Sequence, residues 1–193
     1  MPTTPAHFQA VILHRLGAVE RYLEEDGNVN GREPFQNQTL LHYAATGGAN
    51  HIVNYLLSRN ATVNAKDKRG MTPLMLAAQG DRPTIVRALL NKGARINSKD
   101  NRGMTALMFA ALVPSPEVVR LLIDRGANVH LKSKSNMTAL HFTPLRPPSN
   151  AHRNVIRQLM NKPGFQTLLK NNRVRGLPEG VKMKIFEKLR TLL

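Results

Sequence analysis

The chain has 193 residues, of which 41% are apolar and 21% charged. This composition is typical of a folded protein, and the lack of cysteine excludes disulfides, thiolate metal sites and cysteine nucleophiles. No apolar run approaches the roughly 18 residues of a membrane-spanning helix, and residues 1–16 do not have the pattern of a signal peptide. These features favour a cytoplasmic location.

Positive charge is unevenly distributed along the chain, whose net charge is +16. Residues 131–193 carry 13 basic and 2 acidic side chains, whereas residues 1–130 carry 15 and 10. The few acidic side chains near the start include a cluster at residues 20–26. This asymmetry indicates an anionic partner near the C-terminal half, or a solvated surface that keeps the protein soluble.

Two landmarks recur through the chain at a nearly constant interval. Threonine stands at positions 39, 72, 105 and 138, so that each interval is 33 residues. A β-branched residue stands at positions 29, 63, 96 and 129, with intervals of 34, 33 and 33. The segments KDKRGMTPLMLAA (66–78) and KDNRGMTALMFAA (99–111) are nearly the same peptide. The sequence therefore predicts an array of structural repeats.

The repeated segments resemble the ankyrin repeat, whose signature is T-P-L-H-x-A at a spacing of 33 residues. The matches are TLLHYAA (39–45), TPLMLAA (72–78), TALMFAA (105–111) and TALHFTP (138–144). The resemblance implies an all-α solenoid of about five helix-turn-helix units with projecting β-turn loops, followed by a C-terminal helical extension. The units we expect are 1–30, 31–64, 65–97, 98–130 and 131–164, and the basic extension is 165–193.

Each part of the unit has a physical reason. The four threonines stand where a first helix begins and can cap its free amides, and Pro73 fits the first turn. Paired alanines keep the first helices thin, while apolar residues at i, i+1, i+4 and i+5 give the second helices a buried face. Asn60, Gly93 and Gly126 follow the second helices, where a left-handed conformation is needed.

The two ends of the array depart from the repeat. Residues 6–30 lack the threonine motif, and their polar outer face is typical of a cap. The last unit has four extra residues near Pro144–Pro148, so that residues 155–164 align with 118–127 at an offset of 37.

The loops between units bring basic side chains to successive tips. The resemblance implies that partners dock on these loops and on the concave face beside them, so we expect another protein with an acidic surface. The predicted contacts are Lys66, Lys68, Arg69, Met71, Lys99, Arg102, Met104, Lys132 and Lys134. Methionine suits both adaptable binding surfaces and packing, and packing is favoured for Met75 and Met108. Asp67 and Asp100 match the family's turn aspartate, which accepts hydrogen bonds from the loop backbone.

The sequence favours binding over catalysis. His42 and His141 occupy the motif position that implies a structural hydrogen bond, and His7 with His14 lacks a third metal ligand. Phosphate-binding, zinc-protease and nucleophile-elbow motifs are absent, so we expect no enzyme activity, cofactor or metal. An anion-binding module for nucleic acid or acidic lipid is the alternative; with only 5% aromatic residues, such binding would rely on phosphate contacts.

The C-terminal segment LPEGVKMKIFEKL (177–189) predicts an amphipathic helix. One interpretation is that this helix caps the stack. The other is that it docks a ubiquitin-ligase adaptor, because its pattern resembles the start of an F-box. That resemblance implies a host-directed protein of the poxviral or bacterial kind, acting in the host cytosol as an effector or substrate adaptor. The docking residues would be Leu177, Pro178, Val181, Ile185, Phe186 and Leu189.

Overall fold

The computed structural model describes residues 4–113, 115–143 and 150–160. These residues form α-helices and one 3-10 helix, η1, and contain no β-strand. The helices are α1 (Ala6–Ile12), α2 (Leu16–Glu24), α3 (Leu40–Gly47), α4 (Asn50–Ser58), α5 (Pro73–Gln79), α6 (Pro83–Asn91), α7 (Ala106–Leu112), α8 (Pro116–Asp124), η1 (Ala139–Phe142) and α9 (Asn150–Met160). The predicted all-α solenoid is therefore confirmed.

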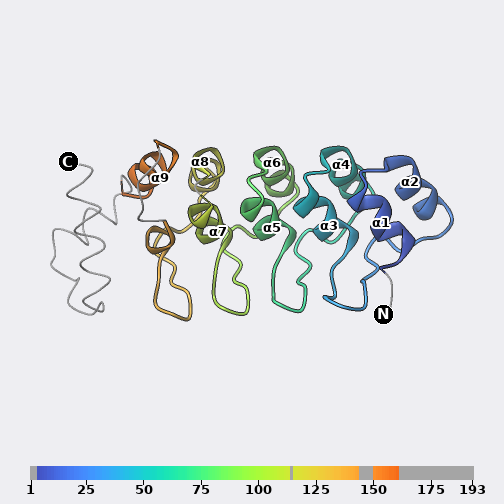
Figure 1. Cartoon of the computed structure of the whole chain (residues 1–193), viewed down its shortest axis with the longest axis horizontal. Helices are drawn as coiled ribbons and strands as arrows, with labels where there is room; N and C mark the ends of the chain where they lie inside the picture. The colour runs from blue at the N-terminus through green and yellow to red at the C-terminus, as the bar shows by residue number, and fades with distance from the viewer. Residues whose placement is uncertain (1–3, 114, 144–149, 161–193) are drawn as a thin grey trace.

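The helices form two layers of a stacked array (Figure 1). The inner layer contains α1, α3, α5, α7 and η1, and the outer layer contains α2, α4, α6, α8 and α9. Each inner helix packs against its outer partner and against the inner helices before and after it. The connections between successive pairs project as long loops from one side of the array (Figure 1).

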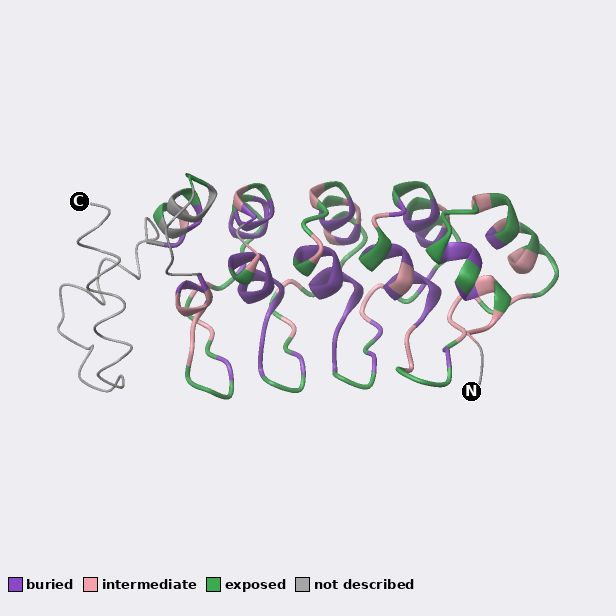
Figure 2. Ribbon diagram, in the orientation of Figure 1, coloured by how far each residue is buried: buried purple, intermediate pink, exposed green. Residues whose placement is uncertain are grey.

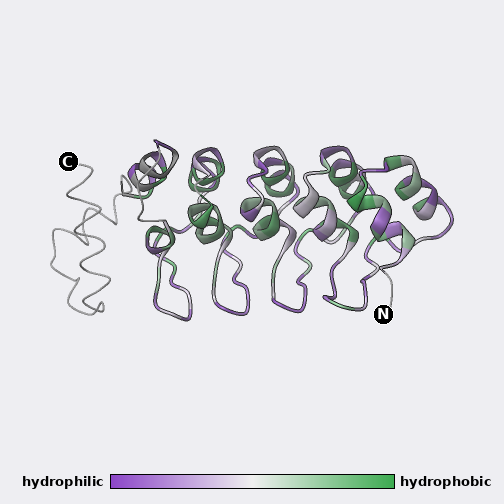
Figure 3. Ribbon diagram, in the orientation of Figure 1, coloured by the Kyte–Doolittle hydropathy of each residue, from purple (hydrophilic) through white to green (hydrophobic). Residues whose placement is uncertain are grey.

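The hydrophobic core runs continuously between the two layers (Figure 2). The alanine pairs of α3, α5 and α7 are completely buried, as expected for positions where inner helices approach one another closely. The outer helices contribute the larger side chains, such as Ile52, Ile85 and Val118. Hydrophilic residues gather along the loop tips and also lie on the outer helices (Figure 3).

Helix ends are fixed by the residues that the sequence predicts. The Thr72 and Thr105 hydroxyls accept hydrogen bonds from the Met75 and Met108 backbone N–H groups. Past the outer helices, the backbone is left-handed at Asn60, Gly93 and Gly126, with φ values of 59°, 83° and 88°. The predicted capping and chain reversal are thus confirmed at these positions.

Asparagine side chains join each repeat to the next on the outer side. The Asn30, Asn64 and Asn97 side-chain oxygens accept hydrogen bonds from the backbone N–H groups of Thr62, Arg95 and Asn128, at 2.7, 2.8 and 2.9 Å. The spacing of these asparagines follows the repeat, and His130 stands at the next position. The same amide contact thus connects successive repeats up to residue 128.

The first helix pair closes the array with a polar outer helix. Val19 is the buried side chain of α2, and the acidic residues 24–26 are exposed. Between α1 and α2, the His7 ring stacks on Tyr22 with centroids 4.0 Å apart. Phe8 takes the place that His42 holds in the next unit and is buried against Tyr43. This packing agrees with the predicted N-terminal cap.

The inner element of the last pair is shortened where the repeat motif fails. This element, η1, is a single 3-10 turn, and Thr143 is extended, with φ −69° and ψ 124°. Pro144 follows, and the residue before a proline is sterically driven out of the helical region. In α9, Val155 and Leu159 are buried as Val118 and Leu122 are, at the predicted offset of 37.

Two predicted features lie outside the described residues: the insertion at 144–148 and the extension at 165–193 with its docking helix. Within the described ranges, no helix is both long and apolar enough to cross a lipid bilayer.

His42 connects the second unit to the loop of the third. Its Nδ1 accepts a hydrogen bond from the Thr39 backbone N–H at 3.1 Å, so the proton of the neutral ring is on Nε2, 3.1 Å from the Met71 carbonyl. Burial is the largest cause that lowers the pKa of His42; Arg32 also lowers it, while Asp67 and the bond to Met71 raise it. The folded chain therefore favours the neutral imidazole.

We expect His42→Met to reduce the pH dependence of stability below neutrality. In the unfolded chain the ring binds a proton as the pH falls through about 6.5, whereas the folded chain binds it only at lower pH. As the pH falls from about 6.5 to the lower pKa of the folded chain, the free energy of unfolding therefore decreases. Above about 6.5, protonation of His42 no longer changes it. Methionine already occupies the equivalent positions 75 and 108, and the Met75 sulfur accepts a hydrogen bond from the Thr72 N–H. The substitution therefore removes chiefly the bond to the Met71 carbonyl, and the loss at pH 7 should be about 1 kcal/mol. Urea unfolding from pH 5 to 7.5 measures both effects; parallel curves for the two proteins would contradict the assignment.

Candidate binding surface

The basic loop residues lie on the projecting edge of the array. We call the exposed cations of three successive loops the loop ridge: Lys66, Lys68, Arg69, Lys99, Arg102, Lys132 and Lys134. All seven are exposed and lie in loops that emerge on the same side (Figures 1 and 2). The fold therefore brings together the charged residues that the sequence singles out.

A buried aspartate organises each of the two most similar loops. One Asp67 side-chain oxygen accepts hydrogen bonds from the Arg69 and Met71 backbone N–H groups, at 2.9 and 2.8 Å. Asp100 does the same for Arg102 and Met104, at 2.9 and 2.7 Å. These bonds confirm the predicted role of the turn aspartates: their carboxylates hold the loop backbone.

Backbone hydrogen bonds connect each loop tip to its neighbour. The Lys68 N–H donates to the Gln36 carbonyl, the Asn101 N–H to Arg69, and the Lys134 N–H to Arg102, at 2.8, 2.9 and 2.9 Å. Left-handed residues permit the tight turns: Asn37, Gly70, Gly103 and Asn136 all have positive φ. The loops thus form a connected edge instead of independent segments.

Several ridge lysines also take part in these connections. The Lys66 amino group donates to the Lys99 carbonyl and the Lys99 amino group to the Lys132 carbonyl, both at 2.8 Å. Lys68 reaches the Pro34 and Phe35 carbonyls of the preceding loop. Among the described residues, the amino groups of Lys132 and Lys134 have no such acceptor. Because an ammonium group has three donors, the bonded lysines keep hydrogen-bonding capacity for a partner.

Met71 and Met104 lie beneath the ridge, with exposed fractions of 3% and 4%. Their burial favours packing over the predicted contact with a partner, although Met71 still lines the hollow described next. Each follows a left-handed glycine, returns the chain toward the inner helices and packs in the core. Met75 and Met108 are also buried, as the packing interpretation favours.

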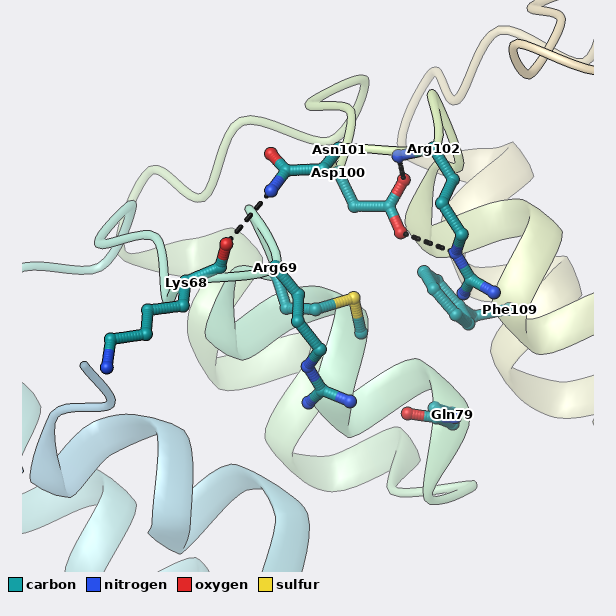
Figure 4. A pocket seen from close by; sticks show the side chains of 8 residues that line it. Lys68, Arg69, Gln79, Asp100, Asn101, Arg102 and Phe109 are labelled. Carbon is teal, nitrogen blue, oxygen red and sulfur yellow. Dashed lines mark hydrogen bonds and ion pairs between the residues drawn. The ribbon is translucent and has the colours of Figure 1, made fainter. Parts of the chain in front are cut away.

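A hollow with a volume of about 380 Å³ opens between the loops 65–71 and 98–104 (Figure 4). Arg69 and Arg102 come from the loops, while Gln79 and Phe109 come from α5 and α7. The Arg102 guanidinium lies over the Phe109 ring, 5.9 Å from its centroid, and Met71 contributes to the lining from below. The hollow thus combines two arginines, the amides of Gln79 and Asn101, the Asp100 carboxylate and the apolar side chains of Met71 and Phe109.

The inner helices continue this surface beside the hollow, on the face predicted to be concave. Positions 12, 46, 79 and 112 are equivalent, at intervals of 34, 33 and 33, and all four residues are exposed. They carry isoleucine, threonine, glutamine and leucine. The residues predicted from the sequence do not include Gln79, Phe109 and Leu112. Each of them stands next to an alanine pair of an inner helix, and this recurrence could have been used to predict them.

The histidines do not form a metal site in the part of the chain that the structure describes. No group of three or more histidine, aspartate or glutamate side chains there could hold a metal ion. Burial lowers the pKa of His7, which stacks on Tyr22. His7 and His42 thus have structural contacts that account for them.

The comparison with protein families agrees with the geometry of the repeats. A family model described as ankyrin repeats (3 copies) matches residues 7–100, and another described as ankyrin repeats (many copies) matches residues 89–142. The comparison with curated proteins finds none that matches the chain. The stacked helix pairs, the buried turn aspartates and the two family matches lead to one conclusion: the chain belongs to the family of ankyrin-repeat proteins.

Proposed function

We propose that this protein is a non-catalytic interaction module that binds an acidic protein partner through the loop ridge and the adjoining face of the inner helices. Ankyrin repeats are generally protein–protein interaction modules. The observation that carries the proposal is the alignment of seven exposed cations on three connected loops.

The fixed conformation of these loops favours tight binding. Buried aspartates and bonds between neighbouring loops fix the backbone before a partner arrives. A preordered surface loses less conformational entropy on association than a flexible one. The net charge of +16 also accelerates the encounter with an acidic surface, most strongly at low ionic strength.

We expect the double variant Lys132→Gln/Lys134→Gln to weaken partner binding about 10-fold, chiefly through a slower association rate. Neither amino group has an acceptor among the described residues, so the fold should be retained. The control Arg87→Gln/Arg120→Gln removes the same charge from exposed positions on the outer helices α6 and α8. Affinity capture identifies the partner, and surface plasmon resonance between about 0.05 and 0.3 M salt compares the variants.

The same experiment separates this proposal from its alternatives. If a protein partner stays bound at high salt, the alternative that the chain is a general anion-binding module is contradicted. Binding to DNA or anionic vesicles without any protein partner would contradict our proposal, as would equal losses in the two double variants. The ubiquitin-ligase adaptor role remains a prediction from residues 177–189; a chain ending at residue 164 that recovers the same adaptor, or recovery of no adaptor, would contradict it.

A further inference from the structure

We infer that the hollow between the loops 65–71 and 98–104 is an anchoring subsite for a glutamate side chain of the partner, flanked by an apolar side chain that covers Leu112. This inference rests on the proposed function, because it assigns a ligand chemistry to one part of the same surface. It concerns binding specificity and involves no covalent step.

Arg102 is held in a position suited to an incoming carboxylate. Its Nε lies 3.4 Å from Asp100 Oδ2, and its guanidinium lies over the Phe109 ring (Figure 4). The side chain nevertheless remains 69% exposed. Its two terminal nitrogens have no acceptor among the described residues, so they can pair with both oxygens of one carboxylate.

Arg69 repeats this arrangement one unit earlier. One of its terminal nitrogens lies 3.4 Å from Asp67 Oδ2, and the side chain is 58% exposed. The remaining guanidinium donors and the Gln79 amide border the same hollow. Two arginines thus bring oriented donors to one small space. Lys68 also lines it, but its amino group points to the preceding loop, where it donates to the Pro34 and Phe35 carbonyls (Figure 4).

The composition of the hollow favours a carboxylate over a phosphate. Asp67 and Asp100 neutralise part of the arginine charge, and Asp100 itself lines the hollow. A phosphate group, with a charge near −2, would meet this carboxylate, whereas a singly charged side chain requires less compensation. Met71 and Phe109 offer apolar atoms to the methylene groups of a glutamate.

Leu112 supplies the apolar contact beside the hollow. It lies one helical turn beyond Phe109 on α7 and is 42% exposed. Covering a large apolar side chain contributes about 25 cal/mol for each Å² removed from water. A partner segment with a leucine next to its glutamate would use both features.

The test is a titration of the full ¹⁵N-labelled chain with the blocked tripeptide acetyl-Leu-Glu-Leu-amide, followed by NMR. We expect saturable shifts in the amides of residues 68–71 and 100–103 and in the Arg69 and Arg102 Nε–H signals. The isosteric probe acetyl-Leu-Gln-Leu-amide should bind at least 5-fold more weakly. This comparison uses the unaltered protein, so it does not depend on the folding of any variant.

Matched variants assign the effect to the hollow. Arg69→Gln/Arg102→Gln should weaken the glutamate probe at least 5-fold, whereas Arg87→Gln/Arg120→Gln, with the same net charge, should change it less than 2-fold. Leu112→Ala should weaken both probes by a similar factor. Equal binding of the two probes, shifts scattered over the basic surface, equal losses in the two double variants, or preference for inorganic phosphate would each overturn the inference.

The inference and the proposed function can fail separately. A protein partner captured through Lys132 and Lys134, together with no preference for the glutamate probe, overturns the inference only. Selective binding of the probe at the hollow supports the inference even where no protein partner is captured, a result that counts against the proposed function.

Discussion

Gly103→Ala is expected to lower the free energy of unfolding by about 3 kcal/mol. Gly103 has a φ of 77°, which is unfavourable for alanine by about 1–2 kcal/mol. A Cβ atom would also lie 2.8 Å from the Lys134 backbone nitrogen, where crowding typically adds about 1–3 kcal/mol. The neighbouring loop would have to move away, which would disturb the bond from the Lys134 N–H to the Arg102 carbonyl.

Gly93→Ala provides the matched control. Gly93 has a similar φ of 83°, but no heavy atom lies within 4 Å of the position of its added Cβ. We therefore expect a loss of about 1–2 kcal/mol, from the backbone conformation alone. Equilibrium urea unfolding of the two variants measures the difference, and equal losses would show that the loops 98–104 and 131–137 do not approach as closely as described.

Leu89→Ala should lower the free energy of unfolding by about 2–5 kcal/mol. Leu89 is fully buried in α6, which packs between α4 and α8 in the middle of the outer layer. The substitution removes apolar contacts and leaves a cavity. Since each repeat is stabilised chiefly by its neighbours, this loss weakens the stack on both sides and is large beside a typical total of about 5–15 kcal/mol.

Leu112→Ala tests whether this effect comes from burial. Leu112 is a large exposed apolar residue of α7, so its truncation should change stability by less than about 0.5 kcal/mol. Thermal and urea unfolding followed by circular dichroism compare the variants. A loss as large as that of Leu89→Ala would mean that Leu112 belongs to the core and is not available to a partner.

Local sequence signals predict the repeated part of the fold well. Thr72, Pro73 and the left-handed Gly93 act within a few residues of their own positions, so their roles follow from backbone chemistry. The spacing of 33 residues then places equivalent groups side by side without knowledge of their contacts. The ridge cations were identified in this way, because the repeat itself aligns them.

Contacts between elements, within one repeat or between two, account for what the sequence did not predict. The burial of Met71 and Met104 depends on how each loop returns to the core. The position of Phe109 beneath Arg102 depends on the distance between a helix and a loop. The sequence does not indicate that a lysine has a hydrogen-bond acceptor, whereas Lys66 and Lys99 donate to carbonyls of the next loop. In each case a contact with another element, and not the residue's own short segment, decides the outcome.

The short reach of the contacts between repeats has a consequence for folding kinetics. The hydrogen bonds described above between one repeat and the next join residues 29 to 34 positions apart. Folding therefore requires the closure of segments about one repeat long, so the entropy lost in each closure does not grow with the length of the array. Such local topology is associated with fast folding. During synthesis, each helix pair can dock onto the pair before it as soon as it emerges.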